Sequence, residues 1–184
     1  MAYTTIDDPS AHFQTLLWTG DDNNDRALTN TGNSDLQPDW VWIKNRSGGT
    51  KSHQLVDSSR GVTKYLFSEA TTVESTLTNR LDSFDSDGFT TDNHSSVNES
   101  SRTYVAWQWK ANGGTTSSNS DGDITSTVQA NTTAGISIVT YTGNGTDGHT
   151  VGTGLTGLWD VAILKNRGQT DYWTVSQTGT NQVM

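Results

Sequence analysis

The chain has 184 residues, a length typical of one domain or of one and a half smaller ones. Only 30% of the residues are hydrophobic, so an apolar core has to come from few, large side chains, chiefly the 7 Trp, 5 Tyr and 4 Phe. The net charge of -9 and the absence of cysteine argue against nucleic acid or anionic lipid as partners and against disulfides, thiolate chemistry and a zinc site.

Short apolar runs separated by turn residues predict β-strands along most of the chain. In chain order these runs are 13–18, 40–44, 65–67, 84–89, 104–110 and 136–141. Helical signals are weak, because Val73, Leu77 and Leu81 have i, i+4 spacing in a Thr-rich stretch that fits a strand or a loop equally well. The sequence therefore predicts an all-β protein with one short helix at most.

Three of these runs predict more than a strand. The run 40–44 is apolar on both faces, which indicates a central strand covered on each side. In 84–89 an Asp-Gly pair lies between two phenylalanines, a pattern typical of a tight hairpin. Alternation in 104–110 sends Val105, Trp107 and Trp109 to one face. We expect core packing for Trp40, Trp42, Trp107 and Trp109, while Trp18, Trp159 and Trp173 fit a buried or an exposed place.

An internal repeat is the most informative feature of the sequence. Ile-Lys-Asn-Arg at 43–46 recurs as Leu-Lys-Asn-Arg at 164–167, an offset of 121 (165 − 44). Leu-Trp-Thr-Gly at 17–20 recurs as Thr-Tyr-Thr-Gly at 140–143, an offset of 123 (143 − 20). Because both order and spacing are kept, these strings predict two copies of one structural module.

The repeat sets the predicted domain boundaries. Residues 1–112 form a first β-sandwich module, the Gly/Ser/Thr-rich residues 113–122 a linker or surface loop, and residues 123–184 an incomplete second copy. Nothing in the second copy corresponds to 62–110, and half of a sandwich exposes its inner face and open edges. Either the chain belongs to a longer protein, the explanation that we favour, or neighbouring subunits complete the half-module by strand pairing.

No catalytic motif emerges from the histidines or the glutamates. Glu69 and Glu74 have the residue type of a glycosidase pair, but solvent-facing positions are the favoured interpretation. The sequence lacks a G-x-S-x-G elbow and any paired-ligand spacing of histidines. The histidines are scattered over His12, His53, His94 and His149. We therefore predict no enzyme, no catalytic residue and no cofactor.

Two acidic segments resemble calcium loops in composition only. Asp82, Asp85 and Asp87 precede Gly88, but no acidic residue closes the loop at its twelfth position. Tight turns are the favoured interpretation for this segment and for 121–123, and a hairpin loop is favoured over a phosphate site for the glycine-rich 143–148. No metal ligand is predicted, and ligand-binding residues stay unassigned.

Four longer strings together resemble a known family. They are residues 3–10, 37–46, 83–89 and 104–110, and they are similar to strings in repeat-bearing structural or tail-fibre-like proteins of marine tailed phages. This resemblance implies an antiparallel β-sandwich of jelly-roll type, like the concanavalin A lectins, and it supplies no binding residues.

The resemblance implies a non-enzymatic surface protein of a virion, such as a fibre, a tail appendage or a head decoration, with a role in host attachment. A protein made in the host cytoplasm without a signal peptide fits the first residues, which have neither a basic nor an apolar segment. Expected partners are other virion proteins, further copies of the chain and a host-surface glycan, but neither nucleic acid nor an inserted membrane. The alternatives are a carbohydrate-binding, lectin-like module and a polysaccharide depolymerase.

Overall fold

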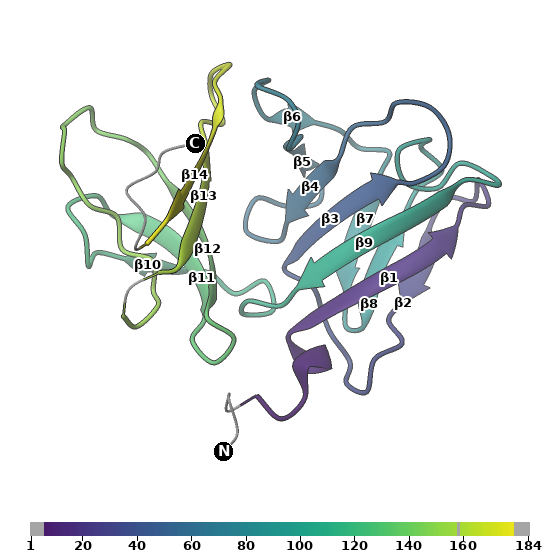
Figure 1. Cartoon of the computed structure of the whole chain (residues 1–184), viewed down its shortest axis with the longest axis horizontal. Helices are drawn as coiled ribbons and strands as arrows, with labels where there is room; N and C mark the ends of the chain where they lie inside the picture. Colours follow the sequence, from purple (N-terminus) through teal and green to yellow (C-terminus); the bar gives the residue numbers. More distant parts are fainter. Residues whose placement is uncertain (1–5, 158, 179–184) are drawn as a thin grey trace.

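The computed structural model describes residues 6–157 and 159–178 (Figure 1). The first residues of the predicted first module and residues 179–184 of the predicted second copy lie outside the described residues. Within the described part the protein is all-β, as predicted, with a single 3-10 turn, η1 (Pro9–Ala11), and strands paired antiparallel in open sheets. No helix of this part is long and apolar enough to cross a membrane.

The main sheet of the first half has the strand order β1-β9-β3-β4. Its central strand β9 pairs with β1 and β3 so that Tyr104 faces Trp18 on one side and Asn45 on the other. The burial of β1 alternates strictly along the strand, which is the pattern of a strand with one face on the core. The bounds are β1 (Phe13–Thr19), β9 (Thr103–Trp109), β3 (Trp40–Asn45) and β4 (Gln54–Asp57).

A second sheet with the order β2-β8-β7 lies across the core from the main sheet. Its strands are β2 (Arg26–Thr29), β8 (Gly88–Thr91) and β7 (Leu81–Asp85), and a short ribbon of β5 (Lys64–Tyr65) and β6 (Ser75–Thr76) lies beside the core. Side chains from both sheets fill the space between them, which gives the first half a sandwich-like core. This core contains Leu16, Trp18, Leu28, Val41, Ile43, Val56, Tyr65, Leu81, Phe89, Val97, Tyr104 and Ala106.

The hairpin predicted at 84–89 is confirmed. Phe84 faces Phe89 and Asp85 faces Gly88 across β7 and β8, with two residues in the turn. Gly88 has φ 108°, and a Cβ at this position would lie 2.0 Å from the carbonyl oxygen of Leu28. Glycine is therefore required both by the left-handed backbone and by the close approach of β2.

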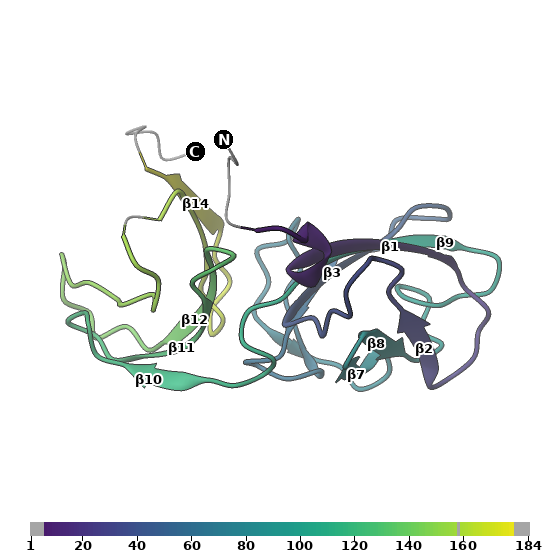
Figure 2. The same ribbon diagram turned by 90° about the horizontal axis from the view of Figure 1, so that it is seen from below.

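The second half consists of two small sheets (Figures 1 and 2). Three strands have the order β10-β11-β12, and β13 pairs with β14 alone. Their bounds are β10 (Ser117–Asn119), β11 (Ser126–Asn131), β12 (Ile136–Tyr141), β13 (Val161–Lys165) and β14 (Trp173–Gln177). The low-complexity segment 113–122 thus carries a strand of its own, which pairs with β11.

The β13–β14 hairpin makes hydrogen bonds that the β3–β4 hairpin also makes. The N–H of Thr178 donates to the carbonyl oxygen of Asp160 (3.0 Å), and the N–H of Ser58 donates to that of Asp39 (2.8 Å). A lysine side chain makes a similar bond in each hairpin: Lys165 Nζ donates to the carbonyl oxygen of Asp171 (2.9 Å), and Lys44 Nζ donates to that of Lys51. Both kinds of bond thus join corresponding positions in the two hairpins.

A buried carboxylate fixes the junction between the halves. Asp39 is fully buried and accepts hydrogen bonds from the N–H groups of Ala111 (2.7 Å), Gly113 (2.8 Å) and Gly114 (2.6 Å), and from Ser58 Oγ (2.7 Å). Gln129 of β11 adds a second link, because its Oε1 accepts from the N–H of Gly114 (2.8 Å) and its Nε2 donates to Ser58 Oγ (2.9 Å). The chain that leads into the second half is therefore held at 111–114.

Candidate functional site

A row of aromatic side chains lies on the outer face of the main sheet. Trp40 stacks on Trp109 with ring centroids 4.4 Å apart, and Phe13 lies 5.1 Å from Trp109 on the other side. Trp42 lies 6.1 Å from Trp40 and 5.9 Å from Trp107. Strand alternation explains the row, since Val41 and Ile43 of β3 point into the core and their neighbours point outward. We call the five aromatic residues, Phe13, Trp40, Trp42, Trp107 and Trp109, the aromatic stripe.

The prediction that Trp40, Trp42, Trp107 and Trp109 form the core is wrong. All four are half-buried on the outer face, and Phe13 and Leu17 beside them are exposed. Trp18 is the core tryptophan instead: it stacks on Tyr104 at 5.3 Å, and its Nε1–H donates to the carbonyl oxygen of Val97 (3.1 Å).

One end of the aromatic stripe continues into an apolar groove of about 210 Å³ between the two halves. Trp173 of β14 lies across this groove from β3, and its Nε1–H is fixed by the carbonyl oxygens of Phe67 (3.0 Å) and Ala70 (3.2 Å). The groove offers a hydroxyl only from Ser68, so it suits an apolar or stacking ligand more than a polar one. Its lining consists of Trp40, Trp42, Leu55, Ser68, Ile163, Trp173 and Val175.

A histidine borders the stripe at Trp42. The Nε1–H of Trp42 donates to Nδ1 of His53 (2.8 Å), and the two rings meet edge to face. Burial, helped by the nearby charge of Lys44, lowers the pKa of His53 below its usual value. The imidazole is therefore neutral at pH 7, which leaves Nδ1 free to accept the indole proton and fixes the ring of Trp42.

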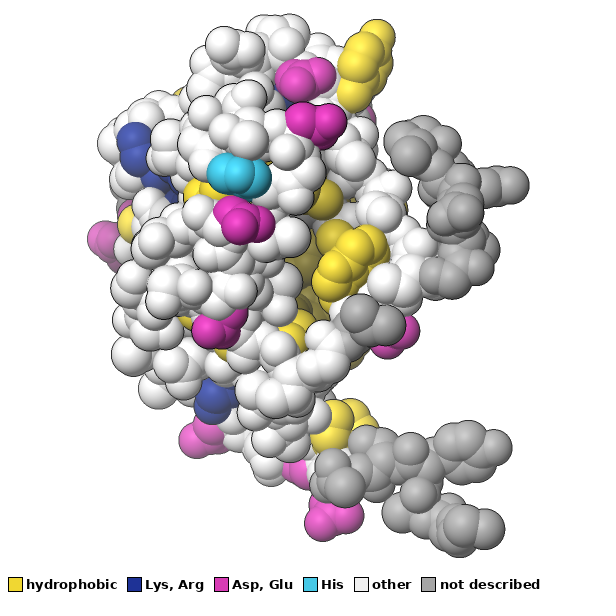
Figure 3. Space-filling model, turned by 90° about the vertical axis from the view of Figure 1, so that its left-hand side faces the viewer, with side chains coloured by type: hydrophobic (Ala, Val, Ile, Leu, Met, Phe, Trp, Pro, Cys, Tyr) yellow, Lys and Arg dark blue, Asp and Glu magenta, His cyan; other side chains and the backbone are white. Residues whose placement is uncertain are grey.

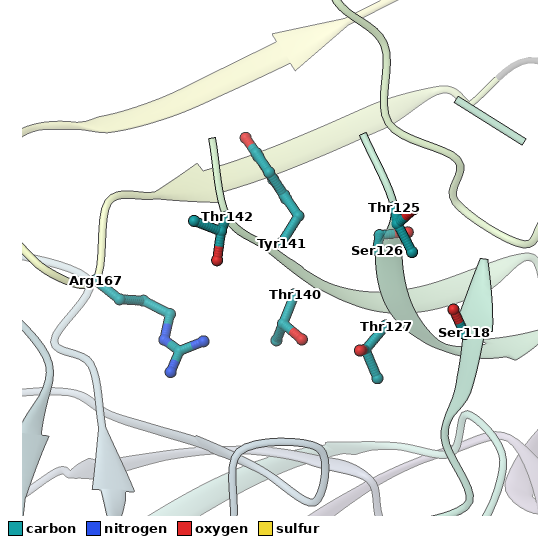
Figure 4. A pocket seen from close by; sticks show the side chains of 8 residues that line it. All are labelled: Ser118, Thr125, Ser126, Thr127, Thr140, Tyr141, Thr142 and Arg167. Atoms are coloured by element: carbon teal, nitrogen blue, oxygen red, sulfur yellow. The ribbon is translucent and has the colours of Figure 1, made fainter. Parts of the chain in front are cut away.

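A second pocket, of about 270 Å³, is lined mainly by hydroxyl groups (Figure 4). Seven of its residues come from β10, β11 and β12 and the ends of these strands, and Arg167 enters from the end of β13. We call it the hydroxyl pocket. Its lining consists of Ser118, Thr125, Ser126, Thr127, Thr140, Tyr141, Thr142 and Arg167. The single cation and the hydroxyls give it donors for a polar ligand.

Three carboxylates from separate segments meet beside the second sheet. Oxygens of Asp25, Asp82 and Asp92 all lie within 4.8 Å of one another, and Oδ2 of Asp82 is buried and accepts no hydrogen bond from the described residues. Burial first, and then the charges of Asp92 and Asp25, raise the pKa of Asp82. This acidic cluster offers three oxygen ligands of the kind that hard divalent cations take.

The three aspartates of the calcium-like segment, Asp82, Asp85 and Asp87, have different roles in the structure. Asp85 accepts hydrogen bonds from Ser83 Oγ (2.5 Å) and Thr90 Oγ1 (2.8 Å), and Asp87 accepts one from the N–H of Leu36 (3.1 Å). The tight turn predicted for these two is confirmed. Asp82 instead lies beside Asp25 and Asp92, which are more than fifty residues before it and ten residues after it. No local motif indicates this cluster.

The other residues weighed for chemistry make structural contacts. Glu74 pairs with Arg60 (2.9 Å) and Arg167 (2.9 Å), and although burial opposes it, the hydrogen bonds from both arginines lower the pKa of Glu74. Glu69 accepts from the N–H of His53 (3.2 Å). Two of the remaining histidines bond locally: His94 Nδ1 accepts from the N–H of Ser96 (3.1 Å), and His149 meets Asn144 (2.8 Å). His12 instead meets Asn131 of β11 (3.3 Å), so this contact and the pair Glu74–Arg167 both join the two halves of the described chain.

Comparison with known proteins yields one match. No curated protein and no solved structure matches the chain. A family profile described as a domain of unknown function, DUF7483, matches residues 8–183. Because this profile spans both halves, the chain belongs to the DUF7483 family.

Proposed function

We propose that this chain is a non-enzymatic surface protein of a tailed-phage virion, built from one jelly-roll sandwich module and an incomplete second copy of it. The repeated hairpin carries the proposal. The strand β12 begins 123 residues after β1 (136 − 13), and β13 begins 121 residues after β3 (161 − 40). The closing bonds at Asp39 and Asp160 recur at the same offset, 121 residues (160 − 39). These matching offsets support the proposed duplication.

A second pair of local contacts supports the duplication. Asn45 Oδ1 accepts from the N–H of Ser47 (2.9 Å), and Asn166 Oδ1 accepts from the N–H of Gly168 (3.1 Å), again 121 residues later (166 − 45). Asn45 is the last residue of β3 and Asn166 directly follows β13, and both shape the turn that comes next in the same way. In both hairpins the Lys and the Asn of the Lys-Asn-Arg string make these contacts, which supports a structural role for the string.

Repeated copies suit multivalent display on a particle. Each copy presents polar loops on a sandwich, and several weak contacts made together give strong attachment without a strong single site. The net charge of -9 adds solubility and keeps the surface away from nucleic acid. The resemblance of four strings to phage structural proteins supports a phage virion as the particle that carries this display.

The test uses particles purified from an infected host. Mass spectrometry of gradient-purified virions is expected to find this protein at many copies per particle, and labelled antibodies are expected to place it on the surface. A matched control is the lysate from which particles were removed. Absence of the protein from intact virions, with abundance in the particle-free lysate, would overturn the proposal.

A glycan-binding role is the second candidate, and the aromatic stripe favours it. Sugar rings stack on aromatic faces, and Trp107 and Phe13 present such faces on the outside of the sheet. A glycan array with the folded protein is expected to give a signal that Trp107→Ala removes. Tyr172→Ala, which changes an exposed aromatic outside the stripe, is expected to keep that signal. Equal signals from both variants would count against this role.

A further inference from the structure

We propose that Asn144 is a site of chemical modification: its side-chain amide loses ammonia by forming a succinimide with the backbone nitrogen of Gly145, and His149 assists the loss. Asn144 lies in the loop after β12, and a glycine follows it directly. Because glycine has no Cβ, the backbone at Gly145 can bring its nitrogen toward the preceding side chain without a steric cost. This chemistry does not depend on the proposed function.

A hydrogen bond already folds the side chain of Asn144 back toward the atom that attacks. The N–H of Thr146 donates to Oδ1 of Asn144 (3.1 Å), and the ring that this bond closes contains the nitrogen of Gly145. Attack of that nitrogen on Cγ turns Oδ1 into an oxyanion. A donor that is in place before the reaction stabilises the developing charge without rearrangement, so this contact favours the first step.

A histidine contacts the group that leaves. Nδ1 of His149 lies 2.8 Å from Nδ2 of Asn144. An amide nitrogen departs readily only after it has gained a proton, and a protonated imidazole at hydrogen-bond distance can supply this proton as a general acid. His149 therefore acts on the departing nitrogen itself.

Water is the only co-reactant that the conversion needs. The nitrogen of Gly145 forms a bond to Cγ of Asn144 and loses its proton to water. The bond from Cγ to Nδ2 breaks, Nδ2 takes a proton from the imidazolium and leaves as ammonia, and water reprotonates the imidazole. A second water then opens the succinimide to aspartate or isoaspartate. The new carboxylate changes the net charge from -9 to -10 (-9 − 1).

The reacting groups all belong to one short surface loop. Residues 141–150 are exposed, so water reaches them directly. Figure 3, which views the second half, shows a surface that consists mostly of backbone and uncharged polar side chains, with a histidine among them. The contacts of Asn144 with Thr146 and His149 lie within this loop and need no other part of the chain.

A second Asn-Gly pair in the chain provides a matched comparison. The N–H of Gly113 donates to the buried carboxylate of Asp39 (2.8 Å), and Asn112 donates from Nδ2 to the carbonyl oxygen of Thr115 (3.0 Å). Attack by the nitrogen of Gly113 would therefore break a bond to a charged acceptor at the junction. Among the described residues, no histidine contacts Asn112, and the N–H of Gly145 has no acceptor.

Peptide mass spectrometry of the full chain, incubated near neutral pH, measures the conversion at both pairs. Asn144 is expected to convert at least about tenfold faster than Asn112, because the charge-assisted hydrogen bond of Gly113 adds to the barrier. In urea, where the fold is lost, the two rates are expected to become similar. Equal rates in the folded protein would overturn the proposal, and so would a difference that persists unchanged in urea, since local sequence alone would then be its cause.

A variant tests the part of His149. His149→Gln keeps a polar side chain but removes the transferable proton, so it is expected to slow conversion at Asn144 at least about tenfold. The rate at Asn112 is expected to stay the same, which makes it the control within the same molecule. Circular dichroism compared with that of the unchanged protein establishes that the fold is kept. A rate at Asn144 that is unchanged or faster in this variant would contradict the assignment of His149.

Discussion

The carboxylate of Asp39 gives the sharpest test of how the two halves are joined. Asp39→Ala removes the acceptor of four hydrogen bonds at the junction. The N–H of Ala111 is buried, and a buried donor left without a partner costs about 1–3 kcal/mol. The N–H groups of Gly113 and Gly114 and the hydroxyl of Ser58 are part-buried, so each loses only the net value of a bond, about 1 kcal/mol.

These contributions add to roughly 5 kcal/mol, and the loss of a desolvated charge offsets part of them. We therefore expect Asp39→Ala to lower the free energy of unfolding by about 3 kcal/mol, a large fraction of the stability of an ordinary domain. Urea unfolding followed by tryptophan fluorescence measures this difference. Asp39→Asn keeps the shape but turns an amide donor toward backbone donors, so it is expected to cost nearly as much.

The repeat supplies a matched control for this experiment. Asp160 is the counterpart of Asp39 and its backbone accepts the equivalent hydrogen bond, but its side chain is exposed. Asp160→Ala is expected to change the free energy of unfolding by less than about 0.5 kcal/mol. Equal losses for the alanine variants at the two positions would refute the reasoning, because the buried acceptor would then have no special role.

Three further outcomes follow from the structure. Gly88→Ala is expected to lower the melting midpoint strongly, with a cost in unfolding free energy above about 2 kcal/mol, because its Cβ would meet the backbone of Leu28. Gly135 has φ 70° but open space around it, so Gly135→Ala is expected to cost only about 1 kcal/mol. Similar thermal melts of the two variants would contradict this. Burial and the neighbouring carboxylates raise the pKa of Asp82, so its carboxyl group destabilises the fold as the pH rises and it ionises; Asp82→Asn is therefore expected to be more stable than the unchanged protein near neutral pH and to lose this advantage in acid. The lowered pKa of Glu74 gives the opposite sign: Glu74→Gln is expected to be less stable by about 1–2 kcal/mol near neutral pH and to approach the unchanged protein as the pH falls below the usual glutamate pKa of 4.5. Unfolding free energies measured against pH that run parallel for variant and unchanged protein would refute either expectation.

Local patterns in the sequence were sufficient for the strand content and for the hairpin at 84–89. Alternation and turn residues depend on neighbours along the chain, so they can be interpreted without knowing the rest of the fold. The positions of β12 and β13 also follow from the sequence, because the repeat sets them relative to β1 and β3.

Which tryptophans form the core could not be predicted from local sequence. The strand β3 is apolar on both faces, so alternation gives two faces but not which of them meets the second sheet. Trp18 lies in the core because β1 alternates exposed and buried residues. The local sequence hides this alternation, since the exposed Leu17 is apolar and the buried Gln14 is polar.

The acidic cluster and the junction at Asp39 were missed for a different reason. Asp25, Asp82 and Asp92 come from three segments that only the folded sheets bring together. Three of the four donors to Asp39 are backbone N–H groups more than seventy residues away, and backbone groups leave no mark in the residue sequence. Contacts of this kind depend on tertiary structure alone.

The stacked indoles of Trp40 and Trp109 make the first half optically distinct from the second. Two indole rings 4.4 Å apart couple their electronic transitions, which produces a paired positive and negative signal in circular dichroism. In the second half, Trp173 is held by hydrogen bonds to backbone carbonyls and stacks on no other ring of the described residues. Loss of the paired signal on heating or in denaturant therefore reports the melting of β3 and β9, independently of what happens to β13 and β14.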